Sequence, residues 1–261
     1  MYDPTANLPR REYYTNLEQL VSAPHVLIAG ATGSGKSVFV NSLLYSITAL
    51  KKPSTASLVL IDPKRVELCQ WRDTAFCVGY ADRPDTALEL LSRVDATMER
   101  RYTEMQAAGQ VMYDGSDIYV VIDELADLLL LYPREFIAPL QHIAQLGRAA
   151  KIHLIACTQS PSRKTLPAAI ILNMTHRIAL RCDSAIESRQ IIGQPGAELL
   201  PQYGYAILKT PGEIKNLQIP MTAPEKLKER QEMFYYPMSV RRNTAAPRPT
   251  FWARLRAILG I

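Results

Sequence analysis

The chain has 261 residues, 48% hydrophobic and 21% charged, proportions that are ordinary for a soluble globular protein and allow one large domain with a full hydrophobic core. Lysine and arginine outnumber aspartate and glutamate by 30 to 25, and the resulting net charge of +5 is compatible with a polyanionic partner without requiring one. No run of about 18 apolar residues is present, and residues 1–11 lack the apolar core of a signal peptide, so the sequence predicts neither a transmembrane segment nor secretion.

The four cysteines do not have the spacing of a metal site. Cys69, Cys77, Cys157 and Cys182 form no Cys-x-x-Cys pair and no zinc-finger pattern. We therefore expect reduced thiols and a cytoplasmic protein, with any membrane association supplied by a partner.

Apolar runs of strand length alternate with helical patterns along most of the chain. Helical spacing of apolar residues covers residues 37–50, 85–105 and 136–150. The predicted strands are the apolar runs at 25–29, 57–61, 118–122 and 152–156, with two further candidates at 177–181 and 205–208. Apolar strands that alternate with helices predict an α/β fold with a mostly parallel central sheet and helices on both faces.

Residues 30–37 match the phosphate-binding loop, or P-loop, Gly-x-x-x-x-Gly-Lys-Ser, and lie between a predicted strand and a predicted helix. Glycines let successive backbone N–H groups turn toward a phosphate, and the following helix presents its positive end to the same anion. We expect Lys36 to reach the β and γ phosphates of ATP and the Ser37 hydroxyl to ligate Mg²⁺. The predicted nucleotide-binding residues are Gly30, Ala31, Thr32, Gly33, Ser34, Gly35, Lys36 and Ser37.

An Asp-Glu pair follows the apolar strand at 118–122. Asp123 is expected to hold Mg²⁺ directly or through water, and Glu124 to polarise the attacking water. Such a pair can also be a solvated strand end, but the phosphate-binding loop in the same chain favours catalysis. The sequence therefore predicts a P-loop ATPase that uses ATP and Mg²⁺.

Other polar residues follow the predicted strands and helices at positions that leave two interpretations open. Gln159 either hydrogen-bonds the γ-phosphate or lytic water, or is only the polar start of a loop. Asp62 and Lys64 either lie near the nucleotide, at the edge where open α/β sheets bind ligands, or form a charged turn. Arg148 either caps the helix that it ends or acts as an arginine finger on the γ-phosphate of a neighbouring subunit.

The chain changes character near residue 223, becoming first charged, then loop-like at 237–250, and ending in a short amphipathic piece at 251–261. We therefore expect a lead-in at residues 1–23, an ATPase domain at 24–222, and a tail at 223–261 that lies outside the core domain.

Six motifs occur in order over roughly residues 17–210. They are residues 24–38, residues 60–64 with Glu67 and Leu68, and residues 121–128, 147–154, 158–162 and 187–192. In order and spacing these motifs resemble the FtsK/SpoIIIE family of DNA translocases. The resemblance implies a RecA-like ATPase that closes into a hexameric ring and pumps double-stranded DNA through its pore. It also implies a nucleotide site made of Lys36, Ser37, Asp123, Glu124 and Gln159, with Arg148 as the finger in trans and Arg189 as a DNA contact on a pore-facing loop.

Two positions depart from the family pattern by losing positive charge. Ser160 stands where the family usually has arginine, and Ala185 stands where it has lysine. Arg163, Lys164 and Arg181 are candidates to compensate in DNA binding, or are ordinary surface charge. The domain that usually precedes the ATPase core is missing, as is a recognisable winged-helix module, so we expect either a fragment or a reduced relative, such as one carried on a mobile element.

Three classes of function fit these observations. The leading hypothesis is an ATP-driven motor that translocates double-stranded DNA, as a homo-hexamer, in chromosome segregation or in transfer of a mobile element, with a membrane-anchored or DNA-processing partner. The alternative is the ATPase core of a protein-secretion system that moves polypeptides. A nucleotide-binding module without motor activity is the third, and the presence of Glu124 argues against it.

Overall fold

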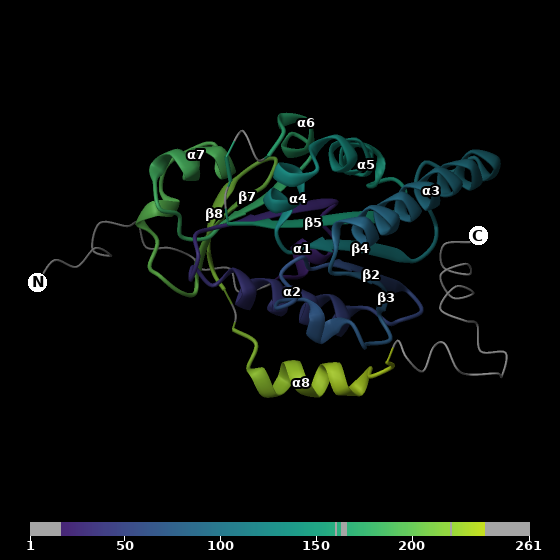
Figure 1. Cartoon of the computed structure of the whole chain (residues 1–261), viewed down its shortest axis with the longest axis horizontal. Helices are drawn as coiled ribbons and strands as arrows, with labels where there is room; N and C mark the ends of the chain where they lie inside the picture. Colours follow the sequence, from purple (N-terminus) through teal and green to yellow (C-terminus); the bar gives the residue numbers. More distant parts are fainter. Residues whose placement is uncertain (1–16, 160, 163–165, 220, 238–261) are drawn as a thin grey trace, which may run out of the picture.

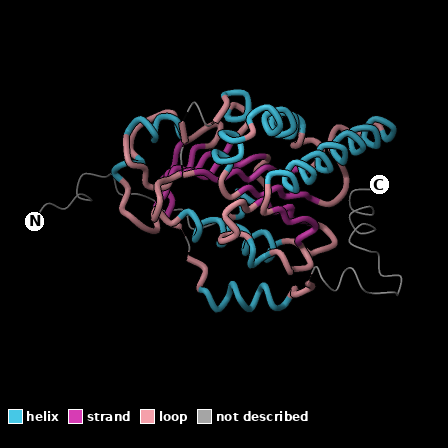
Figure 2. The backbone as a smooth tube through the Cα atoms, viewed as in Figure 1, coloured by secondary structure: helices cyan, strands magenta, loops and turns pink. Residues whose placement is uncertain are grey.

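An eight-stranded sheet runs through the molecule between two layers of helices (Figures 1 and 2). The structure is a computed structural model that describes residues 17–159, 161–162, 166–219 and 221–237. Its strands are β1 (His25–Ala29), β2 (Ala56–Ile61), β3 (Cys77–Ala81), β4 (Asp117–Ile122), β5 (Ile152–Thr158), β6 (His176–Ala179), β7 (Tyr205–Lys209) and β8 (Ile214–Gln218). Its helices are α1 (Glu18–Val21), α2 (Lys36–Leu50), α3 (Pro84–Ala108), α4 (Leu125–Leu131), α5 (Pro133–Leu146), α6 (Ala168–Ile171), α7 (Ala185–Ile192) and α8 (Pro224–Met233), with 3-10 turns η1 (Cys69–Trp71) and η2 (Ala197–Leu199).

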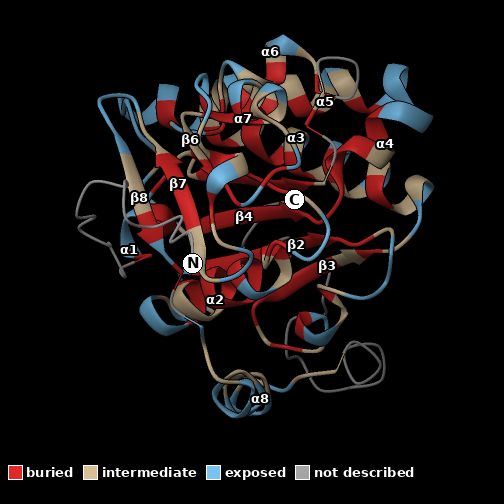
Figure 3. Ribbon diagram, turned by 90° about the vertical axis from the view of Figure 1, so that its left-hand side faces the viewer, coloured by how far each residue is buried: buried red, intermediate tan, exposed pale blue. Residues whose placement is uncertain are grey.

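The strand order is β3-β2-β4-β5-β1-β6-β7-β8. Neighbouring strands from β3 to β6 pair in parallel, whereas β7 pairs antiparallel with both β6 and β8. The predicted α/β fold, with a mostly parallel sheet and helices on both faces, is therefore confirmed. Every residue of β1, β2, β4 and β5 is buried, which explains the continuous apolar runs of these strands (Figure 3).

Two hydrophobic cores lie on the two faces of the sheet. Side chains of a strand alternate between faces, so Leu27 of β1 belongs to the core under α3 and α5, while Val26 and Ile28 belong to the core under α2. Because helices cover both faces, ligands can reach the sheet only where its strands begin or end. We call the side at which the parallel strands end the carboxyl edge, and it carries the polar residues predicted to form the nucleotide site.

The predicted elements differ from the structure in a few places. The helix expected at 136–150 is α5, which begins at Pro133, where the missing N–H of proline costs no helical hydrogen bond, and ends before Gly147. Strands β3 and β8 and helices α4, α6, α7 and α8 were not predicted. Strand β3 contains Gly79, whose missing side chain leaves room for Leu90 of α3, and β8 is an edge strand in which only Leu217 is buried and which has no apolar run.

The part of the predicted tail that the structure describes packs against the ATPase domain. Helix α8 lies alongside α2 (Figure 1), and Arg230 donates to the backbone carbonyl of Thr48. The ring of Phe234 makes an edge contact with Phe76 at a centroid distance of 5.0 Å, and the Ala75 N–H donates to the Phe234 carbonyl at 2.7 Å. Residues 223–237 of the predicted tail therefore contact the ATPase domain, while residues 238–261 lie outside the described part.

The described part of the predicted lead-in is also attached to the sheet. The hydroxyl of Tyr119 in β4 donates to the carbonyl of Val21 at 2.9 Å, and the ring of His153 in β5 hydrogen-bonds the carbonyl of Ala23 at 2.7 Å. Among the helices of the described residues, none is long and apolar enough to cross a membrane.

A buried histidine makes the stability of this fold dependent on pH. His25, at the start of β1, is 2% exposed, and its Nδ1 accepts a hydrogen bond from the Leu154 N–H at 3.1 Å. Burial, with a contribution from the charge of His153, lowers the pKa of His25 from 6.5 to about 3. Folding therefore holds this imidazole neutral at a pH where the unfolded chain binds a proton.

We expect the free energy of unfolding to fall by about 2 kcal/mol between pH 7 and pH 5 because of His25. Acid protonates His25 only in the unfolded chain over this range, so lower pH favours unfolding. Urea unfolding at a series of pH values measures the slope. The His25→Asn variant keeps an acceptor for the Leu154 N–H but does not titrate. The pH dependence of its free energy of unfolding should therefore correspond to one proton fewer taken up on unfolding. An unchanged slope would assign the proton uptake to another group.

Candidate nucleotide site at the carboxyl edge of the sheet

The P-loop connects β1 to α2 at the carboxyl edge. Gly33 and Gly35 have φ angles of +76° and +94°, a backbone conformation that favours glycine. Gly30 has a different reason to be glycine, because a Cβ at this position would lie 2.6 Å from the Cβ of Leu180. The loop therefore depends on glycine both for its turns and for its close approach to the end of β6.

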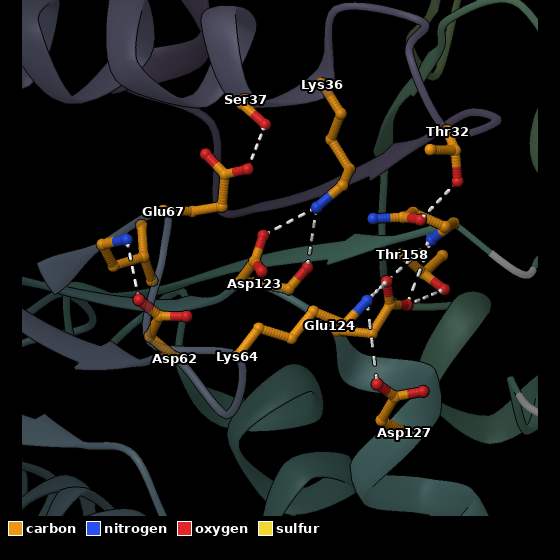
Figure 4. Close-up of polar contacts among 12 residues, drawn as sticks. Thr32, Lys36, Ser37, Asp62, Lys64, Glu67, Asp123, Glu124, Asp127 and Thr158 are labelled. Atoms are coloured by element: carbon orange, nitrogen blue, oxygen red, sulfur yellow. Dashed lines mark hydrogen bonds and ion pairs between the residues drawn. The ribbon is translucent and has the colours of Figure 1, made fainter.

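Lys36 and Asp123 form a buried ion pair across the site (Figure 4). The Nζ of Lys36 lies 2.6 Å from Asp123 Oδ1 and donates to the Asp123 carbonyl at 3.2 Å, and the two side chains are 5% and 1% exposed. Burial alone would lower the pKa of Lys36, but the carboxylates of Asp123 and Glu124 outweigh it and the net shift is upward. Lys36 is therefore a fully charged ammonium at neutral pH, as phosphate binding requires.

Ser37 is held by Glu67, a residue that was not among the predicted site residues. Its hydroxyl donates to the carboxylate of Glu67, which lies in the segment after β2 (Figure 4). Asp62, at the end of β2, accepts from the Leu68 N–H at 3.0 Å and so fixes the turn that carries Glu67. Asp62 thus has a structural contact next to the site.

Glu124 is held on three sides. Its Oε1 accepts from the Thr158 hydroxyl at 2.7 Å and from the Gln159 N–H at 3.0 Å, and its Oε2 lies 3.2 Å from Lys64 Nζ (Figure 4). Lys64 also lies 3.8 Å from Asp127 Oδ2. Glu124 is therefore not a freely solvated strand end. The contacts of Thr158 and Lys64 were missed because they depend on β2, β4 and β5 being neighbours.

Gln159 links the ends of β5 and β1. Its side-chain Oε1 accepts from the Thr32 hydroxyl at 2.8 Å, so the amide lies against the P-loop. The same residue binds Glu124 through its backbone N–H. The structure therefore brings together Lys36, Ser37, Asp123, Glu124 and Gln159, the five residues that the sequence predicted to share one site.

The residues at this edge fit a Mg²⁺–nucleotide complex. Among the described residues, Asp123 Oδ2 is buried without a hydrogen-bond partner, so it is available to a cation or its water. The described residues hold no group of three His, Cys, Asp or Glu side chains suited to a metal ion. Mg²⁺ keeps several waters and is usually bound by one or two protein groups together with substrate phosphates, so Asp123 and the Ser37 hydroxyl are the residues that could hold it.

Arg148 lies at the opposite edge of the sheet. It is exposed in the turn between α5 and β5, before the amino end of β5, whereas Glu124 and Gln159 lie at the carboxyl edge. Strand β5 has seven residues, which span about 23 Å. Arg148 therefore cannot reach the nucleotide site of its own chain.

The structure describes two of the four residues predicted to contact DNA, Arg189 and Arg181. Arg189 is exposed on α7, which corrects the expectation of a loop, and it lines a hollow of about 580 Å³ with Ser162, Leu166 and Ile186 among others. Arg181 is also exposed but lines a different hollow, beside the P-loop. Arg163, Lys164 and Ser160 lie outside the described residues.

Comparison with known proteins agrees with this geometry. The model of the FtsK/SpoIIIE family matches residues 10–116 and 114–163, more than half of the chain. This chain belongs to the FtsK/SpoIIIE family. The DNA translocase FtsK of Tropheryma whipplei (strain TW08/27) is 37% identical over 209 residues, which cover 72% of this chain and 28% of that protein. The chain thus spans little more than a quarter of the length of this FtsK relative.

Two solved structures show how widely the fold of this FtsK/SpoIIIE member is shared. The pCW3 conjugation coupling protein TcpA, in a monomer form with ATPγS, has a TM-score of 0.72 at 23% identity and covers 82% of this chain and 66% of TcpA. The cytoplasmic domain of the Thermomonospora curvata type VII secretion ATPase EccC has a TM-score of 0.68 at 22% identity and covers 88% of this chain and 29% of EccC. A conjugation coupling protein and a type VII secretion ATPase share this fold, so the fold alone does not distinguish between these functions.

Proposed function

We propose that this chain is an ATP-hydrolysing motor domain that moves double-stranded DNA. The observation that carries the ATPase proposal is the convergence of Lys36, Asp123 and Glu124 at one sheet edge, with Glu124 held by three groups. The DNA proposal rests on membership of the FtsK/SpoIIIE family and on the exposed Arg189. The setting that we propose is chromosome segregation or transfer of a mobile element.

ATP binding must replace two contacts of the site. The triphosphate would take the ammonium of Lys36 away from Asp123, and the Ser37 hydroxyl would leave Glu67 to hold Mg²⁺. Ser37 and Asp123 would hold the ion, which when bound neutralises charge on the β and γ phosphates. These exchanges link nucleotide binding to the segments after β2 and β4.

Glu124 would polarise the attacking water, and Gln159 would position the γ-phosphate or that water. Backbone and side-chain donors already fix the carboxylate of Glu124, so little reorganisation is needed during the reaction. Arg148 would complete the site of a neighbouring subunit, because it lies at the opposite edge of its own sheet. This role requires an oligomer, and we propose a homo-hexameric ring in the cytoplasm, with a membrane-anchored or DNA-processing partner.

Duplex DNA should stimulate the ATPase rate severalfold at low salt, and the stimulation should decline as salt rises. Phosphate contacts release counterions, so their contribution falls steeply with ionic strength. Steady-state hydrolysis with and without a duplex of mixed sequence, at two salt concentrations, measures this. A polyglutamate of matched charge controls for a general polyanion effect. An ATPase rate that does not change when DNA is added would oppose the proposal and favour a polypeptide substrate, as in the secretion alternative.

A further inference from the structure

A hollow of about 250 Å³ lies against the P-loop, on the side away from the catalytic groups. One wall is residues 31–34 of the loop, and the other consists of Arg181, Asp183 and Gln202, from the segments that follow β6 and precede β7. Glu124 and Gln159 come from β4 and β5, which lie on the other side of β1. The mechanism outlined above uses none of the three side chains that form the second wall.

Strand pairing fixes the position of this second wall. Strand β6 runs parallel to β1, so its carboxyl end emerges next to the loop. The Leu180 N–H donates to the Ala29 carbonyl at 2.8 Å, and the Ala31 N–H donates to the Arg181 carbonyl at 2.8 Å. Arg181 is therefore attached to the P-loop by its backbone while its side chain is exposed.

The three side chains of the second wall have no hydrogen-bond or ion-pair partners within the described part of the protein. Arg181, Asp183 and Gln202 are exposed, and none of their side chains makes a hydrogen bond or ion pair with another described residue. Arg181 and Asp183 have opposite charges two residues apart and yet do not pair. The hollow thus presents a guanidinium, a carboxylate and an amide together, beside a loop built for phosphate.

These groups match the nucleoside half of a nucleotide. A guanidinium stacks on the face of an aromatic base, a carboxylate accepts hydrogen bonds from ribose hydroxyls, and an amide both donates to and accepts from the edge of a base. The triphosphate half is accounted for by Lys36, Ser37 and Asp123 on the other side of the loop.

We propose that this hollow binds the base and ribose of ATP, with Arg181 stacking on the base and Asp183 and Gln202 contacting the ribose and the base edge. The inference rests on the proposed ATPase function and deepens it. It assigns Arg181 to the nucleotide rather than to DNA.

Isothermal titration with two probes, ATP and inorganic tripolyphosphate, each with Mg²⁺, tests the proposal. Tripolyphosphate occupies only the phosphate half of the site. Arg181→Ala should weaken ATP binding about tenfold, equivalent to about 1.4 kcal/mol, and leave tripolyphosphate binding within about twofold. Asp183→Asn should show the same pattern with a smaller loss. Arg83, an exposed arginine paired with Asp85 at 3.2 Å, supplies the matched control Arg83→Ala, which should change neither affinity.

Either of two results for the folded Arg181→Ala variant would overturn the proposal. Equal loss of both affinities would place Arg181 on the phosphates. Unchanged ATP affinity would remove Arg181 from the nucleotide site, and a simultaneous loss of duplex-DNA affinity would make it a DNA contact. Lys36→Ala should weaken both probes. If the unsubstituted chain binds neither probe, it is the proposed ATPase function that fails rather than the nucleoside subsite. Thermal unfolding of each variant shows that it is folded.

Discussion

Glu124→Gln should bind Mg²⁺–ATP with an affinity near that of the unsubstituted chain and hydrolyse it about 10³-fold more slowly. A positioned general base contributes about 10²- to 10⁴-fold, and an amide cannot take the proton of the attacking water. The amide oxygen can still accept from the Thr158 hydroxyl and the Gln159 N–H. Single-turnover hydrolysis and titration with ATP measure the two quantities separately.

The new amide N–H₂ would face the ammonium of Lys64, so the fold of this variant needs a control. Lys64 has a second carboxylate within reach, because Asp127 Oδ2 lies 3.8 Å from its Nζ and both side chains are about half exposed. We therefore expect a small change in stability. Asp127→Asn removes a carboxylate from the same cluster and should hydrolyse ATP normally. Loss of ATP binding by folded Glu124→Gln would instead give Glu124 a structural role.

The chemistry of the site could be predicted from sequence wherever it depends on short segments. The P-loop is eight consecutive residues whose glycine spacing follows from backbone geometry, and Asp123 and Glu124 follow directly from a buried strand. Buried parallel strands appear in a sequence as continuous apolar runs, and for this reason β1, β2, β4 and β5 could be predicted.

Contacts between segments could not be predicted, because they depend on the order of strands in the sheet. Glu67 meets Ser37, and Lys64 meets Glu124, only because β2 lies beside β4 and both end at the P-loop edge. The packing of α8 was missed for a related reason. Its sequence is highly charged and has no buried residue, so no apolar face indicates that Leu227 packs against the core or that Arg230 bonds to Thr48.

The structure bears directly on the two interpretations of Arg148. A helix-capping role would have Arg148 bind carbonyls at the end of α5. Other groups occupy that end: the Tyr102 hydroxyl donates to the Leu146 carbonyl at 2.8 Å, and the Ile152 N–H donates to the Gly147 carbonyl at 2.8 Å. The Arg148 side chain makes no hydrogen bond or ion pair with the described residues. Its position away from the nucleotide site of its own chain is consistent with the role proposed for it in a neighbouring subunit.

Arg148→Ala should lower ATP turnover about 10³-fold or more, because an arginine finger contributes about 10³- to 10⁵-fold in related reactions. Stability should hardly change, since a capping role would cost at most about 1 kcal/mol and leave turnover largely intact. Thermal unfolding and steady-state ATPase rates of the same preparation separate the two roles. Normal turnover with reduced stability would support the cap.

Mixing Arg148→Ala with Glu124→Gln should restore part of the activity. An Arg148→Ala subunit still has Glu124, and a Glu124→Gln subunit still has Arg148. Where the two are neighbours, one interface contains both residues, whereas neither variant alone can form such an interface. The recovered rate should rise with the fraction of mixed interfaces, and co-purification of differently tagged subunits verifies their assembly. Absence of recovery in verified mixed assemblies would count against a site shared between subunits. Because Arg148 and Glu124 lie at opposite edges of one sheet, recovery would also fix how neighbouring subunits are arranged, with the amino edge of one sheet facing the carboxyl edge of the next.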